Sequence, residues 1–261
     1  LVLSIAFSFT NYDGWKTIDF VGLTNYITLF KDSKFYLSLG RTLLYTVCTL
    51  PFRVIIPLLV AVLLCSKRVA GKSLTRTMVY IPVLMSSLVV GITINWMFSQ
   101  EYGLVNFIIR SLGGTALEWS LNPRLATFVI AFASVWASIG FNMILYIGGI
   151  NSISNDLYEA ATIDGASGVQ AFFRITVPML APTTFMVVLL STVNLLKEYA
   201  LVQGITQGGP GLSTTFIIQY IFDKGFNQMQ YGYASAISTV VMIIFALIAF
   251  AQFKVNNGGE T

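Results

Sequence analysis

Five long apolar runs dominate this sequence and limit what it can fold into. They cover residues 37–65, 77–98, 125–150, 183–203 and 231–253. Each run is long enough to cross the hydrocarbon core of a bilayer as a helix, which takes about 20 residues. Charged residues make up 10% of the chain, whereas soluble domains carry about 25%. We therefore expect an all-α, polytopic integral membrane protein.

A further apolar stretch stands at the start of the chain. Residues 1–9 are too few for a span, so we interpret them as the outer end of a first span that begins upstream. A cleaved signal peptide is the alternative, although no small-residue cleavage pattern follows. The prediction is six transmembrane helices, the first truncated, in a single domain over residues 1–261. Pro51 and Pro57 predict a kink in the second span.

The distribution of basic residues predicts the orientation in the membrane. The loop at 66–76 contains no acidic residue, and its four basic residues are Lys67, Arg68, Lys72 and Arg76. Cytoplasmic loops are enriched in Lys and Arg, so this loop is expected in the cytoplasm. Alternation then places the segment at 151–182 and the tail that begins at Lys254 on the same side.

The polar segment at 155–178 is predicted to form a helical hairpin. Asp156 stands three residues before Glu159, and Ser167 stands three residues before Gln170, which is the capping-box spacing of a helix start. Gly165 suits the left-handed turn that ends the first helix. A hairpin of this kind can dock a partner in the cytoplasm, and an ordinary connector with capping residues is the alternative.

The same segment carries a family resemblance. Its sequence from Glu159 to Pro178, EAATIDGASGVQAFFRITVP, is similar to the EAA loop of bacterial ABC-importer permeases, with Val177 in place of the usual Leu. The GGPG turn at 208–211 and the flanking segments favour the carbohydrate-uptake branch, of the maltose-transporter type. The resemblance implies that this loop inserts into an ATPase subunit. The implied coupling residues are Glu159, Ala160, Ala161, Asp164, Gly165, Ile175 and Pro178.

Polar residues inside two of the predicted spans indicate a substrate pathway. In the fifth span Ser191, Asn194 and Glu198 share one helical face. Charged side chains inside a span are costly and usually face a bundle interior or a watery cavity. The predicted pathway residues are Ser134, Ser138, Phe141, Asn142, Ser191, Asn194, Lys197 and Glu198. In the resembling family Phe141 and Ser191 align with sugar contacts, whereas Leu195 replaces a polar residue. Interhelix packing, or an ion pair with Arg53, is the alternative.

The resemblance also implies a function and a set of partners. It implies one transmembrane permease subunit of a binding-protein-dependent ABC importer for sugars or oligosaccharides, in the bacterial inner or plasma membrane. The expected partners are a second permease subunit, two ATP-binding subunits that hold ATP and Mg²⁺, an extracellular solute-binding protein, the sugar and the lipid bilayer.

Other classes of function are less well supported by the residues. The phosphate-binding pattern GxxxxGK[ST] does not occur in the sequence, so ATP hydrolysis is expected in separate subunits and no enzymatic activity in this chain. Histidine is absent and the two cysteines lack metal-site spacing, so we expect no metal site and no cofactor in this chain. No basic patch with interleaved aromatic residues is evident, so we expect no nucleic-acid binding. An ion-coupled secondary transporter that uses Lys197, Glu198 and Arg53 as a relay is the alternative. Inverted repeats would favour it, and none is evident.

Overall fold

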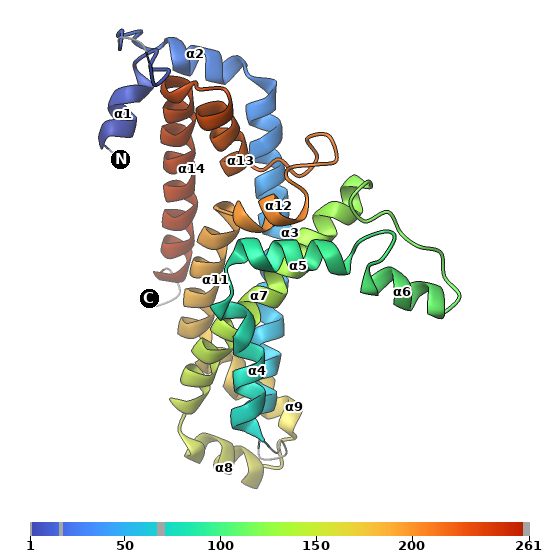
Figure 1. Cartoon of the computed structure of the whole chain (residues 1–261). Coiled ribbons are helices and arrows are strands. Elements are labelled where there is room, and N and C mark those ends of the chain that lie inside the picture. Colours follow the sequence, from blue (N-terminus) through green and yellow to red (C-terminus); the bar gives the residue numbers. More distant parts are fainter. Residues whose placement is uncertain (1, 16–17, 67–70, 258–261) are drawn as a thin grey trace.

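The computed structural model describes residues 2–15, 18–66 and 71–257, which are mostly helical (Figure 1). The elements are α1 (Val2–Ser8), α2 (Thr24–Lys31), α3 (Ser33–Cys65), α4 (Lys72–Leu84), α5 (Ser87–Met97), α6 (Leu104–Ser111), α7 (Pro123–Asn151), α8 (Asn155–Ile163), α9 (Gly168–Ala171), the π-helical η1 (Phe172–Thr176), α10 (Val177–Met179), α11 (Ala181–Leu196), α12 (Ala200–Ile205), α13 (Ile217–Phe222), the π-helical η2 (Asp223–Asn227) and α14 (Tyr231–Asn257).

Three helices are long and apolar enough to cross a membrane without a break. They are α3, α7 and α14, and they correspond to the second, fourth and sixth predicted spans. Two bent helix pairs raise the number of candidate spans to five if each pair counts as one. The seven-residue α1 packs against α14. The first transmembrane span, and therefore the total of six transmembrane helices, stays a prediction.

The third predicted span, at 77–98, is not one continuous helix. The chain forms α4 and α5 instead, which meet at an angle of 101°. Pro82 lies in the last turn of α4 and has no N–H to donate to the preceding turn. The helix ends there, and Ser86 is extended before α5 begins.

The fifth predicted span, at 183–203, is also broken. Its helix α11 ends at Leu196, and α12 starts at Ala200. Between them the Glu198 carboxylate accepts a hydrogen bond from the Leu201 N–H at 3.4 Å, which satisfies a free donor at the start of α12. Lys197 and Glu198 therefore lie at a break between helices and not inside a continuous span. On the other side of α11, the α9–α10 segment meets it at 67°.

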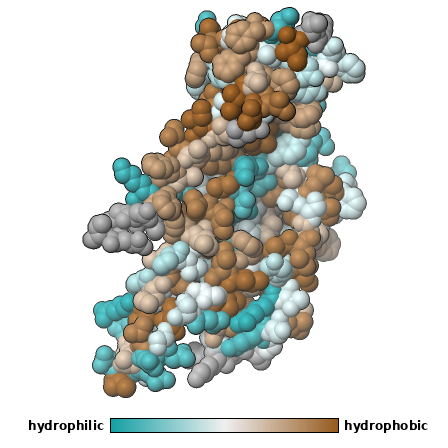
Figure 2. Space-filling model, turned by 90° about the vertical axis from the view of Figure 1, so that its left-hand side faces the viewer, coloured by the Kyte–Doolittle hydropathy of each residue, from teal (hydrophilic) through white to brown (hydrophobic). Residues whose placement is uncertain are grey.

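Two buried clusters connect α3, α7 and α11. One joins Tyr45 of α3, Ile130 of α7, Leu195 of α11 and Leu201 of α12. The other joins α3, α7 and α11 nearer the hairpin, and includes Met143. Much of the outer surface is apolar, because only 22–39% of the most apolar window of each long helix is buried. Figure 2 shows hydrophobic residues over much of one face, with hydrophilic residues between them near the middle and in the lower part.

The two ends of the molecule differ in what they carry. In Figure 1 α1 and α2 lie at one end, whereas α8, α9 and the start of α4 lie together at the other. Lys67 and Arg68 of the basic loop lie outside the described residues. The predicted tail is corrected in part, because α14 continues through Lys254 to Asn257.

Asp32 ties three elements together at the α2 end. Its carboxylate caps α3 by accepting from the Lys34 N–H at 2.9 Å, and it also accepts from the hydroxyls of Tyr220 and Tyr233. Burial alone would raise the pKa of Asp32, but these bonds and one from the Phe35 N–H lower it overall. The carboxylate is therefore ionised at neutral pH and holds α13 and α14 to the start of α3.

Candidate functional site

The hairpin at 155–178 begins with a cap that differs from the predicted one. The Ser154 hydroxyl accepts from the Asp156 N–H at 3.3 Å, so Ser154 is the N-cap of α8. The predicted Asp156–Glu159 capping box is wrong, because a serine two residues earlier takes the cap position. Glu159 consequently lies beyond the first turn, with its side chain exposed.

The turn between the two hairpin helices is as predicted. Gly165 has a φ of +73°. The Ala166 N–H bonds the Ala161 carbonyl at 2.8 Å, and the Gly165 N–H bonds that of Thr162 at 3.1 Å. This pair of bonds is a Schellman motif, which satisfies the last carbonyls of α8. The predicted capping box between Ser167 and Gln170 is confirmed at the start of α9.

The hairpin is anchored to the helix that follows it. The Tyr158 and Thr176 hydroxyls are 2.9 Å apart, which joins α8 to η1. Ile175 packs against the second buried cluster. From there the chain continues through α10 directly into α11. A displacement of the hairpin would therefore be transmitted to α11 through the Tyr158–Thr176 contact, the packing of Ile175 and the continuous chain.

The hairpin surface has no partner within the described chain. No residue of α8 is buried, and Ile163, Val169 and Phe173 are 86%, 68% and 64% exposed. Of the predicted coupling residues, five are exposed and two are half-buried. The exposed ones are Glu159, Ala160, Asp164, Gly165 and Pro178, and the half-buried ones are Ala161 and Ile175. Exposed apolar groups on a rigid polar hairpin are typical of an interaction surface.

A cavity of about 530 Å³, which we call the central cavity, lies between α3, α7, α11 and the break of α4 and α5. It brings together seven of the eight predicted pathway residues. These are Ser138, Phe141, Asn142, Ser191, Asn194, Lys197 and Glu198. Hydroxyl, amide and charged groups thus surround an exposed aromatic ring, an arrangement suited to a polar ligand with apolar faces.

Pro57 explains how α3 is fixed to α7 beside this cavity. Proline has no N–H, so the carbonyl of Arg53, four residues earlier, lacks its usual helical partner. The Asn142 amide donates to that carbonyl at 2.9 Å and to the Ser191 hydroxyl at 3.2 Å. One side chain therefore links α3, α7 and α11.

Ser134 is the predicted pathway residue that does not line the cavity. It is fully buried, and its carbonyl accepts from Nε and Nη2 of Arg53 at 3.2 and 3.1 Å. It thereby positions the Arg53 guanidinium at the cavity wall. Arg53 interacts with Glu198 electrostatically at longer range, so the ion pair considered from the sequence is not a direct hydrogen-bonded contact.

Several cavity residues are not predictable from periodicity within one helix. Arg53 comes from α3, and Tyr199 follows the charged pair at the α11–α12 break. Val83 and Met85 line the cavity because α4 ends beside it. Proline inside α3 and α4 is the sequence signal that indicates a departure from a straight span. Among the residues that the structure describes, no three His, Cys, Asp or Glu side chains are grouped as metal ligands.

Comparison with known proteins identifies the family. The sequence matches the family described as the binding-protein-dependent transport system inner membrane component over residues 23–257. The trehalose/maltose transport system permease protein MalF of Thermococcus litoralis is 33% identical over 237 residues, covering 91% of this chain and 80% of that protein. The arabinooligosaccharides permease protein AraP of Bacillus subtilis is 32% identical over 244 residues, covering 92% of this chain and 77% of that protein.

A solved structure agrees in fold. The crystal structure of a bacterial ABC transporter involved in the import of the acidic polysaccharide alginate has a chain with a TM-score of 0.85 and 23% identity, covering 98% of this chain and 88% of that one. The resemblance inferred from the sequence motifs is confirmed. This multi-pass, helical membrane chain belongs to the family of binding-protein-dependent transport system inner membrane components, the permease subunits of ABC importers.

Proposed function

We propose that this chain is one transmembrane half of an ABC importer for sugars or oligosaccharides. The names of its relatives support that substrate class. A second permease subunit would complete the pathway, and an extracellular binding protein would deliver the substrate. Two ATP-binding subunits would supply ATP and Mg²⁺. The family membership favours this proposal over an ion-coupled secondary transporter.

The observation that carries the proposal is the continuity between the hairpin and the central cavity. The hairpin is rigidly capped, exposed and anchored by the Tyr158–Thr176 contact. The helix that it leads into, α11, contributes Ser191 and Asn194 to the cavity wall. A partner that moves the hairpin would therefore move one wall of the cavity, which is what alternating access requires.

In this proposal the hairpin lies in the cytoplasm and docks on an ATP-binding subunit. Glu159 would present a charge, and Ile163, Val169 and Phe173 would be buried on docking. The remaining predicted coupling residues would shape the hairpin, with Gly165 forming the turn. The start of α4 lies at the same end (Figure 1), and its Lys72 and Arg76 are consistent with a cytoplasmic position.

The substrate would bind in the central cavity without covalent change. Ser138, Asn142, Ser191 and Asn194 offer hydroxyl and amide groups for sugar hydroxyls. Phe141 is 42% exposed and offers a ring face to the apolar side of a sugar ring. Lys197 and Glu198 would act as charged hydrogen-bonding groups at the helix break.

The coupling role is tested by the substitution Glu159→Lys in the reconstituted complex. Like charges facing one another at an interface cost several kcal/mol, so we expect sugar imported per ATP hydrolysed to fall about tenfold or more. The Glu159 side chain forms no hydrogen bond within the described residues, so the fold should be retained. Glu101→Lys, at an exposed acid between α5 and α6, is the matched control. An unchanged ratio in Glu159→Lys would contradict the coupling role.

A further inference from the structure

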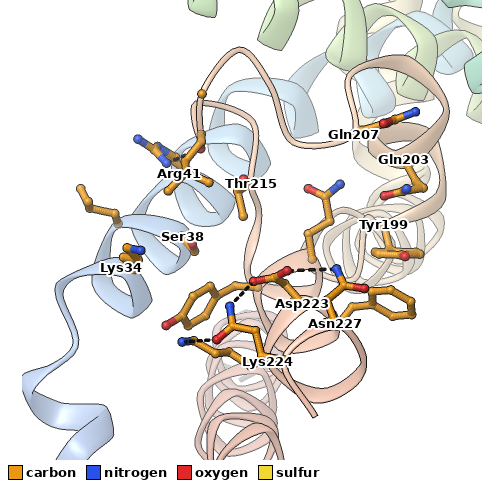
Figure 3. A pocket seen from close by; sticks show the side chains of 17 residues that line it. Lys34, Ser38, Arg41, Tyr199, Gln203, Gln207, Thr215, Asp223, Lys224 and Asn227 are labelled. Atoms are coloured by element: carbon orange, nitrogen blue, oxygen red, sulfur yellow. Dashed lines mark hydrogen bonds between the residues drawn. The ribbon is translucent and has the colours of Figure 1, made fainter. Parts of the chain in front are cut away.

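A second pocket, which we call the outer pocket, lies between the first turns of α3 and the segment from α12 to η2. Its volume is about 430 Å³, and it lies away from the hairpin. Figure 3 shows Lys34, Ser38 and Arg41 of α3 on one side of it and Gln203 and Gln207 on the other. Neither the sequence pattern nor the proposed coupling mechanism accounts for this pocket.

The polar groups of the outer pocket are available to a ligand. The Gln203 and Gln207 side chains form no hydrogen bond with any described residue. The same is true of the Ser38 hydroxyl, although Ser38 is only 3% exposed. Because these groups line the pocket and have no partner in the described chain, they can donate and accept hydrogen bonds to a polar ligand.

The outer pocket carries a surplus of positive charge. Lys34, Arg41 and Lys224 line it, against Asp223 alone. Asp223 already accepts from the Asn227 amide at 3.0 Å and from that of Gln228 at 2.7 Å. The Lys34 ammonium has no partner among the described residues. This excess of positive charge therefore favours a ligand that carries a carboxylate or phosphate group.

One residue connects the outer pocket to the central cavity. Tyr199, at the α11–α12 break, lines both. Its ring lies against that of Phe222, with the centroids 5.2 Å apart. Aromatic rings beside amide groups are suited to the alternating apolar and hydroxylated surfaces of a saccharide. Tyr199 is thus the side chain that the two pockets share.

The separation of the pockets indicates the length of the ligand. Arg41 lines the outer pocket and Arg53 the central cavity. Twelve residues of one helix separate them, a rise of about 18 Å. We propose that the outer pocket binds the trailing end of an acidic oligosaccharide whose leading end occupies the central cavity. This inference rests on the proposed importer function and assigns to it a second subsite and a charged substrate class.

The test measures saccharide binding to the purified, complete importer in lipid nanodiscs without nucleotide. The probes are galacturonate oligomers and malto-oligosaccharides of two and five residues. The proposal predicts that the galacturonate pentamer binds about tenfold or more tightly than its dimer and more tightly than the neutral pentamer. Equal affinity for the two galacturonate lengths, or no binding of either, would overturn it.

Three substitutions assign the binding to the outer pocket. Lys34→Gln should weaken binding of the galacturonate pentamer about two- to fivefold and leave the dimer unaffected. Gln203→Ala should act in the same way, and so should Gln207→Gly, which also relieves the φ of +53° at that position. Lys31→Gln makes the same charge change on exposed α2, outside the pocket, and should have no effect. Equal effects of Lys34→Gln and Lys31→Gln would overturn the assignment.

ATP hydrolysis on the same preparation separates this proposal from the underlying one. If the cognate binding protein fails to stimulate hydrolysis in the parent complex, the importer function itself is contradicted. If hydrolysis is stimulated but the pentamer has no advantage, only the outer subsite is overturned.

Discussion

At the scale of single residues, Pro57 determines how the central cavity is held together. It removes a helical hydrogen bond from the Arg53 carbonyl, and Asn142 supplies the replacement from α7. The consequence of this proline is therefore a polar contact between helices at the cavity wall. The sequence predicts a kink from Pro57 and a pathway role for Asn142, but only the packing of α3 on α7 brings the two together.

A double-mutant cycle tests this contact. Asn142→Leu should lower the free energy of unfolding by about 1–3 kcal/mol, because it leaves the Arg53 carbonyl buried and unpaired. In a Pro57→Ala background the new N–H can satisfy that carbonyl, so the same substitution should cost less. Loss of the bond to Ser191 is common to both backgrounds and cancels. Denaturant unfolding in detergent micelles measures the cycle, and an equal cost in both backgrounds would contradict this account.

At the scale of elements, close contact between glycines holds α5 across α12. A Cβ added at Gly204 would lie 2.9 Å from the Gly91 Cα and 2.7 Å from the Leu88 carbonyl oxygen. The backbones of the two helices therefore touch at this crossing. Both helices are fragments of predicted straight spans, and their contact exists only because those spans are broken.

Gly204→Ala is expected to destabilise this crossing by about 1–3 kcal/mol, because backbone atoms cannot move aside as a flexible side chain can. Gly40→Ala is the matched control, since nothing lies within 4 Å of an added Cβ there. Because Gly40 lies inside a helix, Gly40→Ala should raise the free energy of unfolding by about 0.5–1 kcal/mol. Thermal unfolding midpoints of the purified variants compare them. A midpoint for Gly204→Ala at or above that of the parent would show that the helices can separate freely.

The breaks in the spans also mark what the sequence cannot predict. Hydropathy averaged over a window identifies α3, α7 and α14, because each of these apolar runs forms one continuous helix. It does not detect the bend after Pro82, since Val83, Leu84 and Met85 are apolar. It also misses the end of α11 at Leu196, because the average over the window hides the charged pair Lys197 and Glu198. Local capping is predictable where one residue suits the position, as at Ser167. The prediction of a cap fails where a neighbouring residue can also occupy the N-cap position. At α8, Ser154 takes this position instead of Asp156.

At the scale of the whole molecule, the arrangement places two polar pockets and the exposed hairpin along one set of helices. Seven of the eight predicted pathway residues meet in the central cavity, because periodicity identifies the polar face of a helix. Arg53 and Tyr199 complete the cavity from another helix and from a break. Their roles depend on tertiary packing, which no single-helix pattern contains. The exposed hairpin and the apolar outer surface together indicate a subunit built to be covered by lipid and by partners.

Sugar uptake into vesicles tests the central claim most directly. The complete importer is reconstituted with its binding protein, and uptake of labelled substrate is measured with ATP, without ATP, without the binding protein, and with a proton gradient alone. The account predicts that uptake requires both ATP and the binding protein. Uptake driven by the proton gradient in the absence of ATP would contradict it.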